Sequence, residues 1–549
     1  MSTDFNFILQ NFFARSKPYN NRLLPHGETL LKMPDSDYDV VLYPSYTHPQ
    51  THPDRLAVIA TLFGLQPSRM QNCRVLELGC GNGNNLVPMA WEFPESQFVG
   101  IDLAAKPIAH GQQMARDLAL NNLRLVHGNI TEINETWGNF DYIIAHGFYS
   151  WVPVEVREQL LAICRNRLAP NGVAFVSYNA LPGGHLRNML REMLLFHVRG
   201  FESPDERVSQ AKAFLKFLAD AQDTPDEYRL WMKSEAQRIL EHDEGHLYHD
   251  ELAALNDPLT FTQFIQHAAQ HGLQFLGEAD YFEMSDHYFK DSVRETLSQL
   301  SGNRIAREQY LDFLKCRRFR QTLLCHHEIK LPPAAQPEKI AALLISSNVT
   351  CKNRPTDLRP GVNAVFENNK GAKLETDFPL GKATLLVLEE NSPTPMPFDL
   401  LLIATMSRLT DAGIVETNNS ARVALCEFLL RLYASGTVEL RTSSPPLARQ
   451  TSAHPVASPV ARWQVQRGNL VTSLFHIAVK IEDEVGRCLL SSLDGHHDRA
   501  ALAEKIWQLL KSKNALIISD GDEAAARRKI ESDLDRNLEK LAKIGLLAS

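Results

Sequence analysis

The chain has few cysteines for its length, and none of them lies in a pattern that binds zinc. Eight cysteines are spread over 549 residues, and no two form a C-x-x-C pair. This scatter argues against a disulfide framework or a cysteine zinc site, and it is typical of a reducing compartment. No apolar run approaches the ~20 residues that a membrane-spanning helix needs. The opening "MSTDFNFILQNFFARSKPYNN" has no basic leader and does not read as a signal peptide, so we expect a cytoplasmic protein.

The sequence also lacks an excess of basic residues. It has 57 Lys and Arg against 65 Asp and Glu, a formal net charge of −8. From Trp463 to Ser549 there are 13 Lys or Arg and 13 Asp or Glu, so the tail is neutral. Proteins that read nucleic acid normally carry a basic face. We therefore expect no nucleic-acid partner and no attraction to an anionic membrane.

Short apolar runs alternate with helical patterns over the first half of the chain. The segments "RVLELG", "QFVGIDL", "LRLVHGNI", "FDYIIAHG" and "GVAFVSYN" are predicted strands, and amphipathic segments separate most of them. Strands that alternate with helices predict a parallel, doubly wound α/β sheet of the Rossmann-like type. We expect the sheet to be completed later, by "LQFLGEADYF" and "FRQTLLCHH", after a mostly helical insertion.

The rest of the chain predicts two small α+β units. "NAVFENNKGAKLETDF" reads as a hairpin followed by three helices and the strand "GTVELRT", and the tail repeats a helical pattern. Both units are expected to be winged-helix-like, and the segment between them is rich in Ser, Pro and Ala, as linkers are. The predicted domains are an N-terminal extension (1–37), a core (38–330) with a helical insertion (182–255), a winged-helix-like unit (331–443), a linker (444–462) and a second winged-helix-like unit (463–549).

A glycine-rich turn follows the first predicted strand in "ELGCGNGN". It differs from the dinucleotide pattern G-x-G-x-x-G because the third glycine, Gly83, comes one residue early. Glu77 would repel a pyrophosphate but suits a cationic amino-acid group. Asp102 ends the second strand, where an acid accepts hydrogen bonds from ribose hydroxyls. A nucleoside joined to an amino acid fits both carboxylates, and this points to S-adenosylmethionine.

Several longer segments carry a resemblance to a known family. "VLELGCGNGNN", "FVGIDL", "HGNI" and "FDYIIAHG" resemble the binding motifs of class I S-adenosylmethionine-dependent methyltransferases. "YDVVLYPSYTHPQTHPDRLAVIATLFGL", "FDYIIAHGFYSWVP", "VSYNALPGGH" and "LYHDELAALNDPLTFTQFIQHAAQHGLQFLGEADYFEM" resemble bacterial methyltransferases with a methyltransferase regulatory domain, a group to which rickettsial protein-lysine methyltransferases are similar. The match covers about 38–326, and residues 1–37 do not resemble the family core.

The resemblance implies a role for each matching residue. Glu77 and the turn residues would surround the methionine moiety, Asp102 would hold the ribose, and Leu103 would pack on the adenine. Asn129, where many relatives have Asp, would line the adenine edge with Ile130. His146 would touch the cofactor through its backbone. The expected cofactor-binding residues are Glu77, Gly79, Cys80, Gly81, Gly83, Asp102, Leu103, Asn129, Ile130 and His146.

Two loops at the carboxyl ends of the fourth and fifth strands are expected to hold the methyl acceptor. Neither contains the N-P-P-aromatic sequence of enzymes that methylate base or glutamine nitrogens. Tyr149, Trp151 and Tyr178 could form an aromatic channel for an aliphatic amine and are taken as catalytic, although Trp151 and Tyr178 could instead be core packing.

Further acceptor contacts are expected from the loops and from the upstream segment "YPSYTHPQTHP". His185 could orient a substrate or could be a surface histidine. His48 and His52 lie four residues apart, but the prolines around them break a helix and no further ligand follows, so we expect no metal site. The expected substrate-binding residues are Tyr43, Ser45, His52, Asn179 and His185.

Three functions are compatible with the sequence. The first is a methyltransferase acting on lysine side chains of a protein, with the extra domains holding the substrate. The second is a methyltransferase of a small metabolite, and the third is a non-enzymatic binding protein with a winged-helix tail. The neutral tail favours partner binding or homodimer formation over DNA reading.

Overall fold

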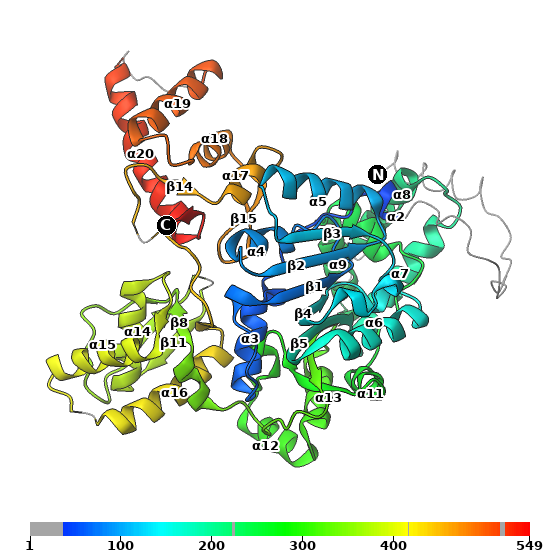
Figure 1. The fold of residues 1–549 in the computed structure, drawn as a ribbon, viewed down its shortest axis with the longest axis horizontal. Helices are drawn as coiled ribbons and strands as arrows, with labels where there is room; N and C mark the ends of the chain where they lie inside the picture. Colours follow the sequence, from blue (N-terminus) through cyan, green and yellow to red (C-terminus); the bar gives the residue numbers. More distant parts are fainter. Residues whose placement is uncertain (1–36, 222–225, 370, 416, 449, 516–521) are drawn as a thin grey trace.

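The computed structural model describes residues 37–221, 226–369, 371–415, 417–448, 450–515 and 522–549. The predicted N-terminal extension, apart from its last residue, therefore lies outside the described residues. Figure 1 shows a large α/β unit and two smaller units beside it, one containing α14 to α16 and the other α17 to α20. Among the described residues, no helix is long and apolar enough to cross a membrane.

A seven-stranded sheet forms the centre of the large unit. Its strand order is β3-β2-β1-β4-β5-β7-β6, with β7 antiparallel to both of its neighbours. This order confirms the doubly wound fold and the prediction that two late strands complete the sheet after a helical insertion. The sheet is mixed rather than parallel throughout, because β7 runs antiparallel to β5 and β6. The strands are β1 (Arg74–Leu78), β2 (Gln97–Asp102), β3 (Leu123–His127), β4 (Phe140–Ala145), β5 (Leu168–Asn179), β6 (Leu273–Glu278) and β7 (Phe319–His326).

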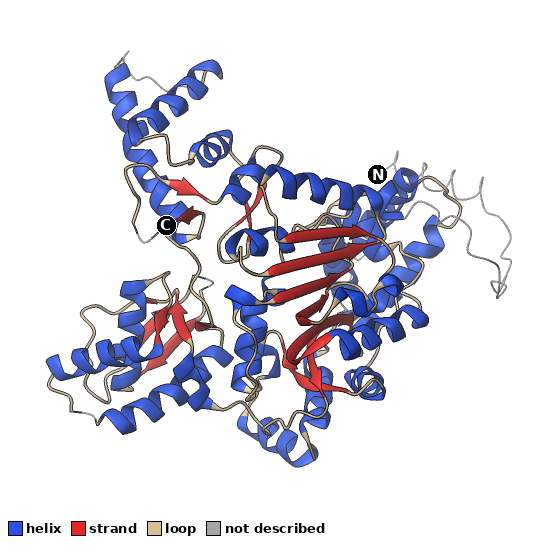
Figure 2. Ribbon diagram, in the orientation of Figure 1, coloured by secondary structure: helices blue, strands red, loops and turns tan. Residues whose placement is uncertain are grey.

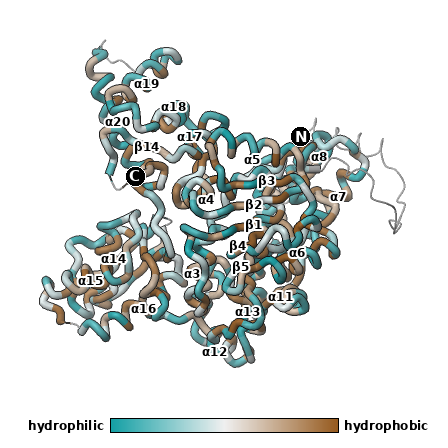
Figure 3. Tube along the Cα trace, in the orientation of Figure 1, coloured by the Kyte–Doolittle hydropathy of each residue, from teal (hydrophilic) through white to brown (hydrophobic). Residues whose placement is uncertain are grey.

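Helices cover both faces of this sheet (Figure 2). The central strands are apolar because both of their faces are buried, and hydrophobic positions gather around β1 and β4 (Figure 3). Leu56 of α3 and Leu86 of α4 pack in the core of one face, whereas Leu160 of α6 and Phe264 of α11 pack in the core of the other. The flanking helices are α3 (Pro53–Leu62), α4 (Leu86–Glu92), α5 (Ala105–Asp117), α6 (Val154–Arg167), α11 (Phe261–Gln270), α12 (Asp291–Leu300) and α13 (Arg304–Lys315).

The segment between β5 and α11 is mostly helical and has its own apolar core. Leu190, Leu215 and Met232 are buried in that core. The segment ends in a π-helical turn, η6 (Leu247–Glu251), which returns the chain toward the sheet. Its helices are α7 (Gly183–Val198), α8 (Pro204–Asp220), α9 (Glu227–Leu240) and α10 (Glu244–His246).

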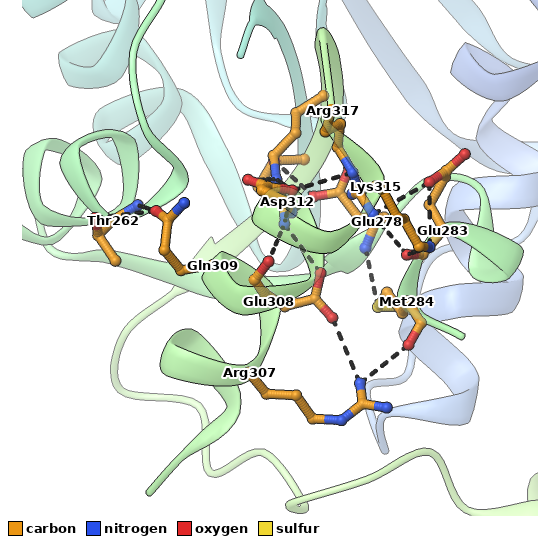
Figure 4. Close-up of polar contacts among 12 residues, drawn as sticks. Thr262, Glu278, Glu283, Met284, Arg307, Glu308, Gln309, Asp312, Lys315 and Arg317 are labelled. Carbon is orange, nitrogen blue, oxygen red and sulfur yellow. Dashed lines mark hydrogen bonds and ion pairs between the residues drawn. The ribbon is translucent and has the colours of Figure 1, made fainter. Parts of the chain in front are cut away.

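A buried ionic cluster fixes the two late strands to α13. The side chain of Arg320 on β7 is 0% exposed and pairs with Glu278 at 2.6 Å, Asp312 at 2.9 Å and Glu308 at 3.1 Å. Figure 4 shows these carboxylates between β6 and α13, together with Arg317, which pairs with Asp312 at 3.0 Å. Because Arg320 of β7 pairs with residues of β6 and α13, the cluster joins three elements and fixes the geometry of this edge of the sheet.

The unit predicted over 331–443 contains two small sheets and three helices. Strands β10 and β11 pair as the predicted antiparallel hairpin, and β13 follows the three helices as expected. Its elements are η8 (Pro337–Ala342), β8 (Leu344–Ser347), β9 (Thr350–Cys351), β10 (Ala364–Glu367), β11 (Lys373–Thr376), α14 (Pro379–Asn391), β12 (Met396–Pro397), α15 (Phe398–Asp411), α16 (Asn418–Ala434) and β13 (Val438–Arg441).

The C-terminal unit begins inside the segment predicted as a linker. Residues 444–462 contain β14 and the start of α17, because Pro459 opens that helix and the Ser458 side chain accepts a hydrogen bond from the Ala461 N–H. The elements are β14 (Val456–Ala457), α17 (Pro459–Val465), β15 (Leu470–Thr472), β16 (Ala478–Lys480), α18 (Glu484–Ser492), α19 (Arg499–Ser512), α20 (Glu523–Lys543) and β17 (Leu547–Ala548).

Candidate active site

The glycine-rich turn between β1 and α4 has a backbone that only glycine adopts without strain. Gly79, Gly81 and Gly83 have φ angles of +72°, +55° and +74°. A Cβ atom on Gly79 would lie 2.5 Å from the Phe148 ring, and one on Gly83 would lie 2.8 Å from Leu125. A Cβ on Gly81 would meet nothing within 4 Å. The turn therefore packs closely on two sides and leaves open space at Gly81.

A cavity of about 630 Å³ opens at this turn, at the carboxyl ends of β1, β2 and β4. This volume is typical of small-molecule sites, and this edge is where doubly wound sheets bind ligands. All the predicted cofactor residues except Gly83 line the cavity, namely Glu77, Gly79, Cys80, Gly81, Asp102, Leu103, Asn129, Ile130 and His146.

Glu77 is a buried carboxylate with one free oxygen. Its Oε1 accepts a hydrogen bond from Asn85 Nδ2 at 2.8 Å, whereas Oε2 is buried and has no partner among the described residues. Burial raises the pKa of Glu77 to about 8. An unpaired buried carboxylate oxygen is costly unless a donor meets it. The residues present therefore fit a ligand that brings a cationic amino group to this oxygen.

Asp102 is held in place by backbone donors. Its Oδ2 accepts a hydrogen bond from Gly81 N and its Oδ1 one from Ala104 N, both at 2.8 Å. Burial raises its pKa. Each carboxylate oxygen has further lone pairs, so Asp102 can still accept from a ligand hydroxyl. Leu103, next along the chain, is 42% exposed in the cavity wall.

Asn129 uses its side-chain oxygen locally. Oδ1 accepts a hydrogen bond from Thr131 N at 3.0 Å, which caps the short helix η3 (Ile130–Glu132). This arrangement leaves Nδ2 as the group that can face a ligand.

The other end of the cavity is built from segments that are distant in the sequence. Tyr43 and Ser45 come from the stretch after α2 (Asp37–Val40), Trp151 comes from η5 (Tyr149–Trp151), and Asp250 comes from η6. The Tyr43 hydroxyl lies 3.5 Å from both carboxylate oxygens of Asp250. This end therefore combines aromatic walls with a carboxylate.

Two of the three predicted channel aromatics lie elsewhere, and this corrects the prediction. Tyr149 and Tyr178 are 2% and 1% exposed and do not line the cavity. Tyr178 stacks on Phe264 of α11 with ring centroids 4.2 Å apart, and the Tyr149 hydroxyl lies 2.5 Å from His267 Nδ1. Side chains alternate between the two faces of a strand, and Tyr178 faces the side that α11 covers. Of the three, only Trp151 reaches the cavity.

Three of the predicted substrate contacts are also absent from the cavity lining. His52 is buried, and its Nδ1 caps α3 by accepting from Asp54 N at 3.2 Å. Asn179 Nδ2 donates to Asn256 Oδ1 at 2.6 Å, and His185 is exposed on the first turn of α7. These positions contradict a direct contact with a ligand in the cavity, because two of the side chains are used in packing and capping.

Two of the histidines that line the cavity are in ring contact with each other. The rings of His48 and His146 have centroids 3.9 Å apart. Burial lowers the pKa of His48 to about 4 and holds the pKa of His146 well below its ordinary value. Both rings are therefore neutral at pH 7. His48 was not predicted as a site residue from the sequence, because its contact with His146 joins segments nearly a hundred positions apart.

One group of side chains has the geometry to hold a metal ion. Ligand atoms of Glu158, His267 and His271 all lie within 4.8 Å of one another. Each histidine Nε2 is hydrogen-bonded to a different oxygen of Glu158, at 2.9 and 2.8 Å. The group lies outside the cavity, and the expectation that the chain has no metal site stays a prediction.

The sequence matches three protein families. One described as a methyltransferase domain matches residues 75–172, a predicted methyltransferase regulatory domain matches residues 243–326, and a PKMT, C-terminal winged helix domain matches residues 453–546. These matches confirm the predicted resemblance and the winged-helix character of the tail.

Individual relatives match along most of the chain. An uncharacterized protein of Rickettsia prowazekii (strain Madrid E) is 31% identical over 506 residues, which cover 91% of this chain and 90% of the relative. The structure of PKMT2 from Rickettsia typhi is 28% identical, has a TM-score of 0.83, and covers 92% of this chain and 100% of its own. The same protein in complex with AdoHcy gives a TM-score of 0.82. The chain therefore belongs to the S-adenosylmethionine-dependent methyltransferases that join a class I methyltransferase domain to a methyltransferase regulatory domain and a C-terminal winged-helix domain.

Proposed function

We propose that the chain transfers methyl groups from S-adenosylmethionine to lysine side chains of a protein substrate. In this proposal Glu77 binds the amino group of the cofactor and Asp102 accepts from the ribose hydroxyls. Leu103, Asn129 and Ile130 hold the adenine. When bound, S-adenosylmethionine supplies an electrophilic methyl group on a sulfonium.

The charge of the cavity is the observation that best supports an amine as the methyl acceptor. Its charged lining residues are Glu77, Asp102, Asp250 and Lys106. The Lys106 ammonium donates a hydrogen bond to the backbone oxygen of Asp39 at 2.8 Å, so this cation already has a partner in the protein. The lining therefore has three carboxyl groups against one paired ammonium. Burial raises the pKa of Glu77 to about 8, but a bound cation favours its ionised form, and an amino group and a sulfonium are both cationic.

The acceptor end fits one long aliphatic side chain. Trp151 and Tyr43 supply ring surface for the methylene groups, and Asp250 supplies a carboxylate for the ammonium that they carry. Arg187 lies 5.5 Å from the Trp151 ring centroid and 3.9 Å from Asp250, so the ammonium would share this carboxylate with a guanidinium. Burial between rings then favours the neutral amine over the ammonium, whose pKa is about 10.4 in water. Because His48 and His146 are neutral, they place no positive charge beside the sulfonium.

Two features support a protein rather than a small metabolite as the substrate. Asp250 belongs to the segment matched by the regulatory-domain family, so that domain contributes to the acceptor end. One relative of known structure is PKMT2 from Rickettsia typhi, a protein lysine methyltransferase. The neutral C-terminal tail gives no support to a nucleic-acid substrate.

A labelling experiment with blocked and free lysines tests the proposal. The full chain would be incubated with S-adenosylmethionine carrying a labelled methyl group and a bacterial lysate, either untreated or with its lysines acetylated, because an amide nitrogen cannot accept the methyl group. We expect label in the protein fraction of the untreated lysate only. Trp151→Ala should reduce transfer at least tenfold without changing cofactor affinity.

Val154→Ala is the matched control, because Val154 is 57% exposed and lies just outside the cavity lining. It should leave transfer unchanged. Label that enters the small-molecule fraction, or that is insensitive to lysine blocking, would contradict the lysine acceptor.

A further inference from the structure

The hairpin β15–β16 of the C-terminal domain ends in a loop that reaches the methyltransferase domain. We refer to residues Ser473–Ile477 as the wing loop. We propose that the wing loop supports the cofactor site from outside its lining, and that His476 is a positioning residue that orients Asn85 and, through it, Glu77. This inference rests on the proposed contact between Glu77 and the amino group of S-adenosylmethionine.

The C-terminal domain is anchored beside the glycine-rich turn. Val460 of α17 packs against Val87 of α4 and Met114 of α5 in a shared apolar cluster. Trp463 Nε1 donates a hydrogen bond to Asp117 Oδ2 at 2.9 Å. Since α4 begins at the end of the turn that lines the cavity, this docking brings the wing loop behind the cofactor site.

The backbone of the wing loop adopts a conformation that presents His476 inward. His476 has a φ angle of +61°, which is uncommon for a residue other than glycine. Its amide donates to Ser473 O at 2.9 Å, and the residue is only 5% exposed. Such a conformation persists where surrounding contacts compensate for its cost. The neighbouring Ile477, in contrast, is 43% exposed.

A chain of hydrogen bonds leads from His476 to the carboxylate. His476 Nε2 lies 2.9 Å from Asn85 Oδ1, and Asn85 Nδ2 donates to Glu77 Oε1 at 2.8 Å. The backbone N–H of His48 also donates to Asn85 Oδ1, at 3.1 Å, which identifies this atom as the amide oxygen. His476 therefore acts as a donor through Nε2–H, and Asn85 turns its NH2 group toward Glu77.

The donor to Asn85 is a neutral ring. Burial, with the rings of His52 and His48 nearby, holds the pKa of His476 well below its ordinary value. A neutral imidazole donates from one nitrogen only, so the bond to Asn85 also fixes the tautomer. With Asn85 held from both sides, Glu77 Oε1 is occupied and the unpartnered Oε2 is left for the ligand.

The consequence is that docking of the C-terminal domain contributes to cofactor affinity. Without the His476 donor, Asn85 keeps its hydrogen bonds to the His48 N–H and the Thr51 hydroxyl, but it is held less firmly and so orients Glu77 less well for the incoming amino group. Loss of one such hydrogen bond corresponds to roughly a tenfold change in a dissociation constant. The loss of affinity should be confined to ligands that carry the amino-acid portion of S-adenosylmethionine.

Three variants of the full chain separate this role from general packing. His476→Leu keeps bulk but removes the donor, His476→Gln keeps an N–H donor at similar reach, and Ile477→Ala is the matched control on the same loop. Calorimetry would measure the affinity for S-adenosylhomocysteine, which has the amino group, and for 5′-methylthioadenosine, which lacks it.

We expect His476→Leu to bind S-adenosylhomocysteine about tenfold more weakly and 5′-methylthioadenosine as tightly as wild type. His476→Gln should recover most of the lost affinity, and Ile477→Ala should bind both ligands normally. An equal loss for both ligands, or no recovery in His476→Gln, would overturn the positioning role.

Glu77→Gln separates failure of this inference from failure of the proposed cofactor contact. If Glu77→Gln weakens S-adenosylhomocysteine binding but His476→Leu does not, the wing loop has no role and the cofactor contact stands. If Glu77→Gln leaves binding unchanged, the contact itself is wrong, and the role of His476 falls with it.

Discussion

Replacing Glu77 with Gln should make the empty protein more stable and the cofactor bind more weakly. Burial raises the pKa of Glu77 to about 8, so the folded protein holds this proton at pH values where the unfolded chain releases it. Stability therefore falls as pH rises between the ordinary pKa of about 4.5 and about 8. At about 1.4 kcal/mol per pH unit, the penalty at pH 7 is roughly 3 kcal/mol. The amide carries no such penalty.

The same substitution should change how cofactor binding depends on pH. A cationic amino group favours the ionised form of Glu77, so binding below pH 8 requires the loss of a proton. Affinity of the wild type should then fall by up to about tenfold for each pH unit below 8, because of this group alone. Glu77→Gln should show a nearly flat profile and, at pH 8, an affinity lower by roughly ten- to a hundredfold.

Calorimetry with S-adenosylhomocysteine between pH 6 and 8, in buffers of different ionisation enthalpy, measures both affinity and proton release. Thermal unfolding without ligand measures stability. Equal pH slopes for wild type and variant would refute the assignment of Glu77 as the partner of the amino group. A lower melting temperature for the ligand-free variant would refute the stability argument.

Three further predictions, one of them with a control substitution, test other parts of the structure. Asp102→Ala should weaken S-adenosylhomocysteine binding by at least tenfold, because the ribose hydroxyls lose a charged acceptor worth about 1.5–3 kcal/mol per bond; unchanged affinity by calorimetry would contradict this role. Arg320→Met should lower the free energy of unfolding by about 3–5 kcal/mol in urea titrations, since it leaves buried carboxylates without their partner. Arg294→Met, at an exposed pair, should leave the free energy of unfolding nearly unchanged, and losses equal to those of Arg320→Met would contradict the buried-cluster argument. Tyr149→Phe should cost about 1 kcal/mol of stability and leave methyl transfer intact, because the Tyr149 hydroxyl bonds to His267 outside the cavity. A large loss of transfer would instead indicate that Tyr149 acts at the acceptor site.

The parts of the site that were predicted from sequence depend on local spacing. The glycines of the turn, Glu77 before it and Asp102 after the next strand follow one another within a single β-α-β unit. Their backbone geometry is set by neighbours in the chain, so the pattern is readable without the rest of the fold. The doubly wound fold was predicted from the same alternation of strands and helices, whereas the order of the strands comes from the structure.

The acceptor end and the wing loop depend on contacts between distant segments. Asp250 reaches the cavity because a helical insertion turns back at η6, and His476 reaches Asn85 from another domain. Neither contact leaves a periodic signal in the sequence. The wrong prediction for Tyr178 has a similar cause. The sequence shows that successive side chains of β5 point to opposite faces of the sheet, but it does not show which face α11 covers.

The most direct test of the central claim is mass spectrometry of the methylated product. The full chain would be incubated with S-adenosylmethionine carrying a trideuterated methyl group and a protein substrate isolated from the labelled lysate fraction. The account predicts deuterated methyl groups on lysine side-chain nitrogens, and their loss with Trp151→Ala but not with Val154→Ala. Deuterated methyl groups on another residue type, or on lysine at equal levels in both variants, would contradict it.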